Sequence, residues 1–226
     1  MGSSPTLFSI NLFGLPVEIT MDILAQWVII AILSLFAIYS TSSLKNIPDR
    51  RQNRIEILVD TVNKLVTDNM GEEYKNFVPY IGTLMIFLLS MNLSGLFGVE
   101  PPTRDYSIAL SLGLITFIVI QGHVIRKHGL LHYFLGYTNP YAVMMPLNII
   151  ERIMIPISLS LRLFGNMTAA SVLVGLIYSG LGGLGLLSQL GIPIPFHFYF
   201  DIFDGTIQMI IFTMLTMINI KVISEH

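Results

Sequence analysis

Long apolar stretches alternate with short polar segments along nearly the whole chain. These stretches cover residues 22–43, 77–97, 106–125, 146–178 and 196–222. Each is long enough to cross about 30 Å of hydrocarbon as a helix. The pattern predicts an all-α polytopic membrane protein with about five membrane-crossing helices. Because the sequence has no internal repeat and no soluble domain, we expect residues 1–226 to form a single membrane domain.

Residues 50–70 follow a different pattern. Apolar side chains recur at helical spacing, and basic and acidic side chains fill the other face. The apolar positions are Ile55, Leu58, Val59, Val62, Leu65 and Val66. The segment therefore predicts an amphipathic helix on the cytoplasmic side, which lies on the membrane or between partner proteins.

The composition favours a membrane protein over a soluble domain with an anchor. Charged residues make up 12% of the chain, against roughly 25% in soluble domains, and the mean hydropathy is +0.72. The net charge of −2 provides no bulk attraction to nucleic acid. The chain has no cysteine, which excludes disulfides and thiolate chemistry. We therefore expect a lipid bilayer and no nucleic acid around the chain.

Lysine and arginine are concentrated on one side of the predicted spans. The segment between the first two spans and the one after the third span carry Lys45, Arg50, Arg51, Arg54, Lys64, Lys75, Arg126 and Lys127, and Lys221 lies at the C-terminal end of the last span. The opposite side carries Arg104. The positive-inside rule then places the N-terminus outside the cell and the C-terminus in the cytoplasm, as five crossings require.

The helix predicted over 146–178 carries a line of polar side chains. Ser158, Arg162 and Asn166 are spaced four residues apart, and Glu151 precedes Arg162 by about three helical turns. A charged side chain at the centre of a bilayer costs several kcal/mol at least. The spacing therefore predicts that this face of the helix contacts protein or water rather than lipid.

The last predicted helix carries a second such line. His197, Asp201, Asp204 and Gln208 follow one another at intervals that keep them on one face of an α-helix. A structural alternative stays open for these groups, because Asp201 or Asp204 is able to neutralise Arg162 within one bundle. His197 lies near the start of the helix, which favours an interfacial position over a relay.

Three other patterns do not indicate a cofactor or metal site. The segment "GLGGLG" at 180–185 matches a dinucleotide fingerprint, but no strand precedes it. His123, His128 and His132 have no carboxylate or cysteine nearby, which favours a basic cluster beside the membrane. An intramembrane zinc protease needs an HExxH motif, which is absent from the sequence. We expect no cofactor and no metal ion.

Two segments closely match a known family. "PISLSLRLFGNMTAA" and "FDGTIQMIIFTMLTMI" resemble the most distinctive motifs of subunit a of F-type ATP synthases, and the order of spans also matches. The resemblance covers essentially the whole chain and favours the bacterial form in the cell membrane. It implies a stator that is no enzyme by itself, because ATP is made on distant soluble subunits. The implied partners are the c-subunit ring, the b-subunit peripheral stalk and the remaining synthase subunits.

The resemblance also implies a mechanism for Arg162. The two long helices lie tilted against the c ring, and two offset half-channels meet the ring near this arginine. Each c subunit carries a carboxylate that stays neutral in lipid, where an unpaired ion is very costly. Beside Arg162 the carboxylate ionises, because an opposite charge favours its charged form. Arginine keeps its proton, so it gates ions without relaying them.

Family residues transfer position by position. Arg162 takes the place of the essential arginine, and Asn166 and Gln208 take the polar positions beside it. Glu151 matches an acidic position that some members have on the cytoplasmic approach, and Ser158 extends the polar line. This sequence departs from many members of the family at two positions. It has Ser171 where they have an acidic residue, and Asp201 where they have a histidine. Asp204 is an additional carboxylate.

The resemblance leaves the coupling ion open. Protons are our default expectation, and Na⁺ is the alternative, because carboxylate, amide and hydroxyl oxygens also suit a hydrated Na⁺ path. A self-contained ion transporter is the nearest rival function. Many such transporters contain structural repeats, and the sequence shows none.

Overall fold

The computed structural model describes most of the chain. The described residues are 6–12, 15–42, 44, 45, 47–129, 143, 145–181, 191 and 193–225. Within them, five helical segments are long and apolar enough to cross a membrane. This confirms the predicted class of an all-α polytopic membrane protein.

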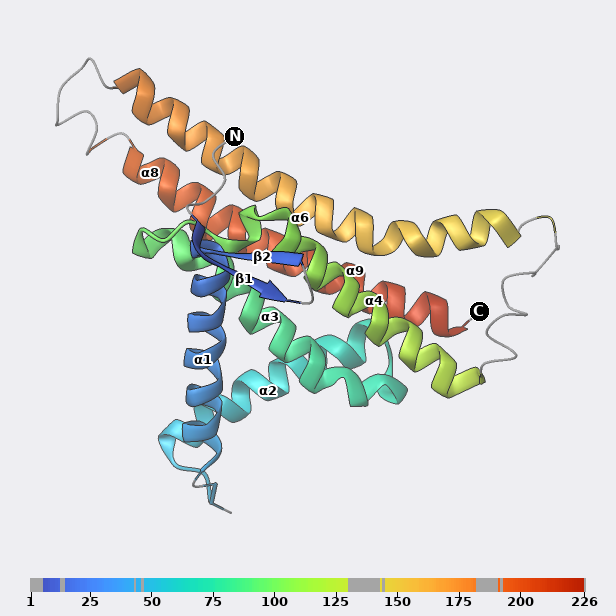
Figure 1. Cartoon of the computed structure of the whole chain (residues 1–226). Coiled ribbons are helices and arrows are strands. Elements are labelled where there is room, and N and C mark those ends of the chain that lie inside the picture. Colours follow the sequence, from blue (N-terminus) through green and yellow to red (C-terminus); the bar gives the residue numbers. More distant parts are fainter. Residues whose placement is uncertain are drawn as a thin grey trace.

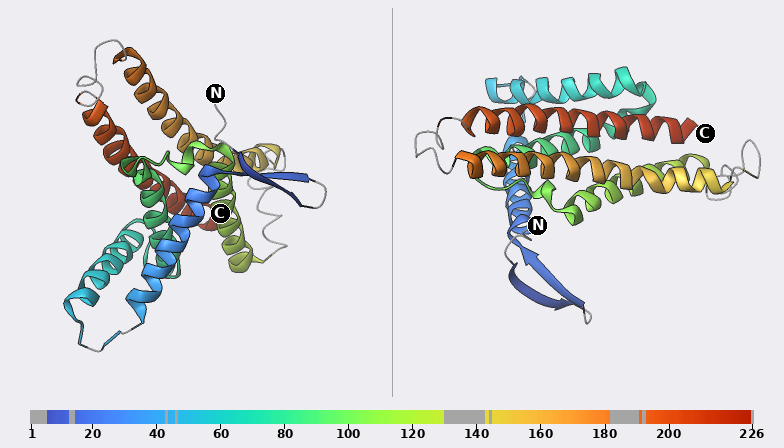
Figure 2. Two further views of the ribbon diagram at one scale, coloured as in Figure 1. Left: turned by 60° about the vertical axis from the view of Figure 1, so that its left-hand side comes forward. Right: turned by 90° about the horizontal axis from the view of Figure 1, so that it is seen from above.

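A β-hairpin that the sequence pattern did not predict precedes the first helix. Strands β1 (Thr6–Leu12) and β2 (Leu15–Thr20) pair in antiparallel register from Leu12 opposite Leu15 to Thr6 opposite Thr20. The hairpin projects away from the helices (Figure 2). Thr20 then serves as the N-cap residue of the first helix, so the second strand leads directly into the first span.

Helix α1 (Met21–Thr41) stands at a steep angle to the long helices (Figures 1 and 2). Apolar side chains are exposed all along it, including Trp27, Leu35 and Ile38. A helix that is apolar all round needs an apolar environment. Lipid around α1 supplies that environment.

The predicted amphipathic segment forms helix α2 (Arg50–Asn69), which leads through the 3₁₀ turn η1 (Glu72–Phe77) into α3 (Val78–Asn92). Its C-terminal half packs on the bundle, because Val62 and Val66 are buried. Leu58 and Val59, which belong to the same predicted apolar face, are exposed. The helix is therefore only half covered by the described residues.

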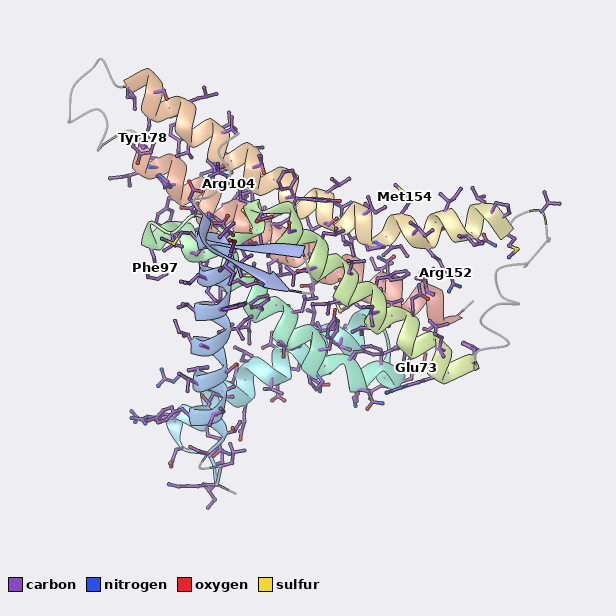
Figure 3. The ribbon with its side chains drawn as sticks, viewed as in Figure 1. Glu73, Phe97, Arg104, Arg152, Met154 and Tyr178 are labelled. Carbon is purple, nitrogen blue, oxygen red and sulfur yellow. The ribbon has the colours of Figure 1, made fainter. Side chains whose placement is uncertain are left out.

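The short turns η2 (Leu93–Phe97) and η3 (Pro102–Arg104) connect α3 to helix α4 (Tyr106–His128). Helix α4 packs along helix α6 (Met145–Leu181). Helix α6 changes direction near the labelled Met154 (Figure 3). Pro156 lies inside α6 and lacks the N–H that would bond to the carbonyl four residues earlier. Proline is a common cause of such a bend.

The last helical segment has three consecutive parts, α8 (Pro193–His197), η5 (Phe198–Asp204) and α9 (Gly205–Glu225). It runs beside α6 for part of its length (Figure 1). The middle part, η5, is a π-helix, whose wider turns are formed by hydrogen bonds to the fifth residue. Such segments occur often at functional sites.

Two buried apolar clusters hold these helices together. One joins the end of α2 to α3, α4 and the C-terminal half of α9, through residues that include the completely buried Val66, Ile120 and Met217. The other joins α3, α4, α6 and the first half of α9, through residues that include Leu163 and Phe212. Helix α6, which carries the first predicted polar line, and α9, which carries Gln208 of the second, are therefore fixed to a common core.

The contact between α4 and α6 depends on Gly113. A β-carbon at this position would lie 2.7 Å from the backbone carbonyl oxygen of Pro156. Because the backbone of α6 cannot easily move away, we expect Gly113→Ala to destabilise the fold by about 1–3 kcal/mol, as overpacking does. Thermal unfolding in detergent measures this loss. Gly122→Ala is the matched control, since nothing lies within 4 Å of its added carbon, and equal melting temperatures would contradict the prediction.

Candidate ion-translocation site

Arg162 is a partly exposed cation in the middle part of α6. It makes no hydrogen bond or ion pair with any residue that the structure describes. In particular, neither Asp201 nor Asp204 is paired with it. The alternative that Arg162 neutralises one of these carboxylates within the bundle therefore does not hold in this structure.

Asn166 and Gln208 join the two helices that carry the predicted polar lines. The Asn166 Nδ2 group donates to Gln208 Oε1 at 2.7 Å. Asn166 lies one helical turn after Arg162, and Gln208 is completely buried. The Gln208 Nε2 group has no hydrogen-bond partner among the described residues. The bond fixes α9 against α6 next to the arginine.

Asp201 lies in the π-helical segment η5 and is bonded to its own helix. His197 Nδ1 lies 3.2 Å from Asp201 Oδ2. The other ring nitrogen, Nε2, lies 3.4 Å from the Tyr178 hydroxyl of α6. Figure 3 shows Tyr178 at the end of α6 that faces α8. The three side chains form a short polar chain between the two long helices.

The π-helix changes the predicted second polar line. The predicted line requires α-helical spacing from His197 to Gln208, and the wider turns of η5 alter the angles between those side chains. Asp201 lies against Gly95 of η2, whereas Gln208 lies against Asn166 of α6. Asp204 is partly exposed and forms no hydrogen bond with the described residues. These residues therefore face different neighbours.

The remaining predicted residues lie along α6. Glu151 and Ser158 are exposed and form no hydrogen bond or ion pair within the described part of the chain. Ser171 is partly buried and donates to the Thr168 carbonyl oxygen at 2.9 Å. No described residue thus occupies the polar groups of Arg162, Glu151 and Ser158, which leaves them accessible to water or to partner proteins.

Two polar contacts near the site were not predicted. Arg152, which follows Glu151, donates to Gln121 Oε1 of α4 at 3.3 Å and points from α6 toward α4 (Figure 3). Asn92 is completely buried and donates to the carbonyl oxygen of Gly205 at 2.9 Å, where η5 meets α9. The signal for Asn92 was an amide inside an apolar segment, because a buried amide needs partners.

No group of three or more histidine, cysteine, aspartate or glutamate side chains could hold a metal ion in the ranges that the structure describes. The site instead consists of a cation that has no partner within these ranges, an amide pair and separate carboxylates. This arrangement suits the transient pairing of charges better than the permanent binding of an ion.

Comparison with known proteins identifies the family. Residues 23–221 match the model of the ATP synthase A chain family. The chain is 37% identical to ATP synthase subunit a 2 of Bradyrhizobium sp. (strain BTAi1), over 97% of this chain and 96% of that protein. It is 32% identical to the subunit a of Propionigenium modestum that is described as sodium ion specific, over 93% and 75% of the two chains.

A third relative is ATP synthase subunit a of Moorella thermoacetica, which is 33% identical over 89% of each chain. The family match covers the helices that carry Arg162, Asn166, Asp201 and Gln208. It agrees with the five apolar spans of the described chain. The chain is therefore a membrane component of an ATP synthase complex and belongs to the ATP synthase A chain family.

Proposed function

We propose that this chain is the ion-translocating stator of a bacterial F-type ATP synthase and that Arg162 is its gate. The observation that carries the proposal is a partly exposed arginine on a long apolar helix, with no hydrogen-bond or ion-pair partner among the residues that the structure describes. An uncompensated charge at this depth is expensive. A partner outside the chain must therefore neutralise it, and a carboxylate of the c ring has the right charge.

The pairing of Arg162 with a ring carboxylate explains how ion flow is coupled to rotation of the ring. A ring carboxylate that enters lipid must be neutral, whereas one beside Arg162 is stabilised as an anion. The ring carboxylate therefore gives up its ion near Arg162 and takes another before it returns to lipid. Because the guanidinium stays protonated and repels cations, ions cannot pass directly from one half-channel to the other. Ion flow is then possible only with rotation of the ring.

The other site residues divide between the two half-channels. Asp201, with Asp204 assisting, lines the outer half-channel. Glu151 marks the cytoplasmic approach, and Ser158 and Ser171 extend the polar path along α6. Asn166 and Gln208 hold α6 and α9 together beside the gate, as their 2.7 Å hydrogen bond supports. The long helices α6 and α8–α9 lie tilted against the ring.

The proposed assembly contains the c ring, the b-subunit peripheral stalk and the remaining synthase subunits, with nucleotide chemistry on the soluble part. Copurification tests it. An affinity tag on this chain is expected to recover an oligomeric c ring and the soluble ATPase from detergent-solubilised membranes. Recovery of this chain alone under conditions that keep other synthases intact would contradict the proposed assembly.

Protons are the proposed coupling ion, and Na⁺ is the second candidate. The specific observation for Na⁺ is the relative that is described as sodium ion specific, at 32% identity over 93% of this chain. Synthesis by the purified complex, measured with and without added Na⁺ under a proton gradient, separates the two. Strict dependence on Na⁺ would refute the proton assignment and leave the gate unchanged.

The proposed orientation puts the N-terminus outside and the C-terminus in the cytoplasm. A cysteine at Lys64 of α2 is expected to react with an impermeant thiol reagent from the cytoplasmic side, and one at Arg104 of η3 from the outside. The absence of native cysteine gives both variants a clean background. Labelling of intact cells and of inverted membrane vesicles measures the sides. The reverse pattern would exchange the two half-channels.

A further inference from the structure

The carboxylate of Asp201 occupies space that a glycine provides. A β-carbon on Gly95 of η2 would lie 2.7 Å from Asp201 Oδ1, 2.8 Å from Cγ and 2.9 Å from Oδ2. These distances are shorter than van der Waals contact, so no side chain larger than hydrogen fits at position 95 while the carboxylate keeps this place. Gly95 therefore determines how closely Asp201 approaches the turn between α3 and α4.

A histidine fixes the carboxylate from the other direction. His197 Nδ1 lies 3.2 Å from Asp201 Oδ2, and the Tyr178 hydroxyl lies 3.4 Å from His197 Nε2. When the carboxylate carries its negative charge it only accepts hydrogen bonds, and Nδ1 is then the donor. A neutral imidazole then accepts the Tyr178 O–H at Nε2. One tautomer thus satisfies both contacts, and Tyr178 sets the orientation of the ring.

The contacts leave Asp201 less accessible than its partner. The Asp201 side chain is 13% exposed, while that of His197 is 38% exposed. The titratable groups in contact with His197 are Tyr178 from α6 and Asp201 from η5, and η2 has no titratable residue. The Asp201 carboxylate is thus restricted to one place by the contact with Gly95, by the hydrogen bond with His197 and by the short length of its own side chain.

We propose that Gly95 and His197 are positioning residues, which hold the Asp201 carboxylate where it meets the coupling ion in the outer half-channel. This inference rests on the proposed function, because it assigns Asp201 to that channel. Holding a charged group in place matters for function, since displacement by about 1 Å is enough to cost a large share of a rate.

The test uses the purified synthase in vesicles. ATP synthesis is measured against the outside concentration of the coupling ion, which separates the half-saturating concentration from the maximal rate. For His197→Ala we expect that concentration to rise about tenfold, as the loss of a hydrogen bond to a charged group predicts. His197→Asn keeps an N–H donor near the position of Nδ1 and is expected to restore most of the parental value.

Gly95→Ala tests the same carboxylate from its other side. We expect a similar rise in the half-saturating concentration, because the carboxylate is the end of a side chain and moves away from the new methyl group. In an Asp201→Ala background the same change is expected to have no further effect, since coupled positions are not additive. Gly122→Ala, with nothing within 4 Å of the added carbon, is the matched control.

Each outcome decides the inference. Parental ion dependence in His197→Ala or Gly95→Ala would overturn it, and so would an Asn variant as impaired as the Ala variant. If Gly95→Ala blocks assembly in both backgrounds, the methyl group meets something other than the carboxylate, and the inference fails. Synthesis that survives Arg162→Ala would instead refute the proposed gate, so the two failures are distinguishable.

Discussion

Replacing Arg162 by alanine is expected to lower gradient-driven ATP synthesis by at least about 100-fold, the usual cost of removing a preorganised group that stabilises charge. Without the cation, a ring carboxylate has no reason to ionise at the interface, and the ring stops delivering ions. The complex should still assemble, because Arg162 makes no hydrogen bond or ion pair with the described residues of its own chain. Inverted membrane vesicles under an imposed gradient measure the rate.

Lysine at the same position is the informative control. It keeps a positive charge but lacks the planar fork, is shorter and is able to lose its proton when desolvated. We therefore expect Arg162→Lys to fail or nearly fail, with normal amounts of assembled complex. Substantial synthesis by the alanine variant would contradict the gate. Full activity of the lysine variant would show that a positive charge is enough for gating and that the planar guanidinium is not needed.

The second large effect is expected at Asp201. Asp201→Asn keeps the size of the side chain and removes the negative charge that the outer half-channel offers to a cation. We expect a loss of about tenfold or more in ion-coupled synthesis, from the weaker interaction with the ion and with His197. Synthesis measured across pH and across Na⁺ concentration shows whether the loss follows the coupling ion.

Asp204→Asn is the matched variant for this prediction. Asp204 lies in the same π-helical segment, is partly exposed and forms no hydrogen bond with the described residues. We expect a smaller loss than for Asp201→Asn, since Asp201 takes the channel position of the family. Parental activity in Asp201→Asn would remove that residue from the pathway. A larger loss in Asp204→Asn would reverse the two roles.

The helices could be predicted from hydropathy because each span must be apolar over a fixed length. The segment predicted at 146–178 corresponds to α6 at Met145–Leu181, and the one at 196–222 corresponds to α8, η5 and α9 together. The hairpin was missed because its strands lack the polar two-residue turn that usually signals such a pair. The hairpin is held by hydrogen bonds between its two strands, and the length of an apolar stretch gives no information on such pairing.

The chemistry of the site was less accessible from sequence. The spacing of Arg162 and Asn166 was readable because α6 is an α-helix there. The neighbours of Asp201 could not be predicted, because no local residue pattern marks a π-helix and because Gly95 lies on a turn far away in the sequence. The bond from Asn92 to Gly205 spans 113 positions, and helical periodicity carries no information at that distance.

The central claim is that this chain moves ions only together with a c ring. Reconstitution tests it most directly, by measuring ion flux into vesicles at an imposed membrane potential of known size. We expect flux when this chain and the c ring are both present, and background flux when either is omitted. Sustained flux through this chain alone would refute the stator function and establish a self-contained transporter.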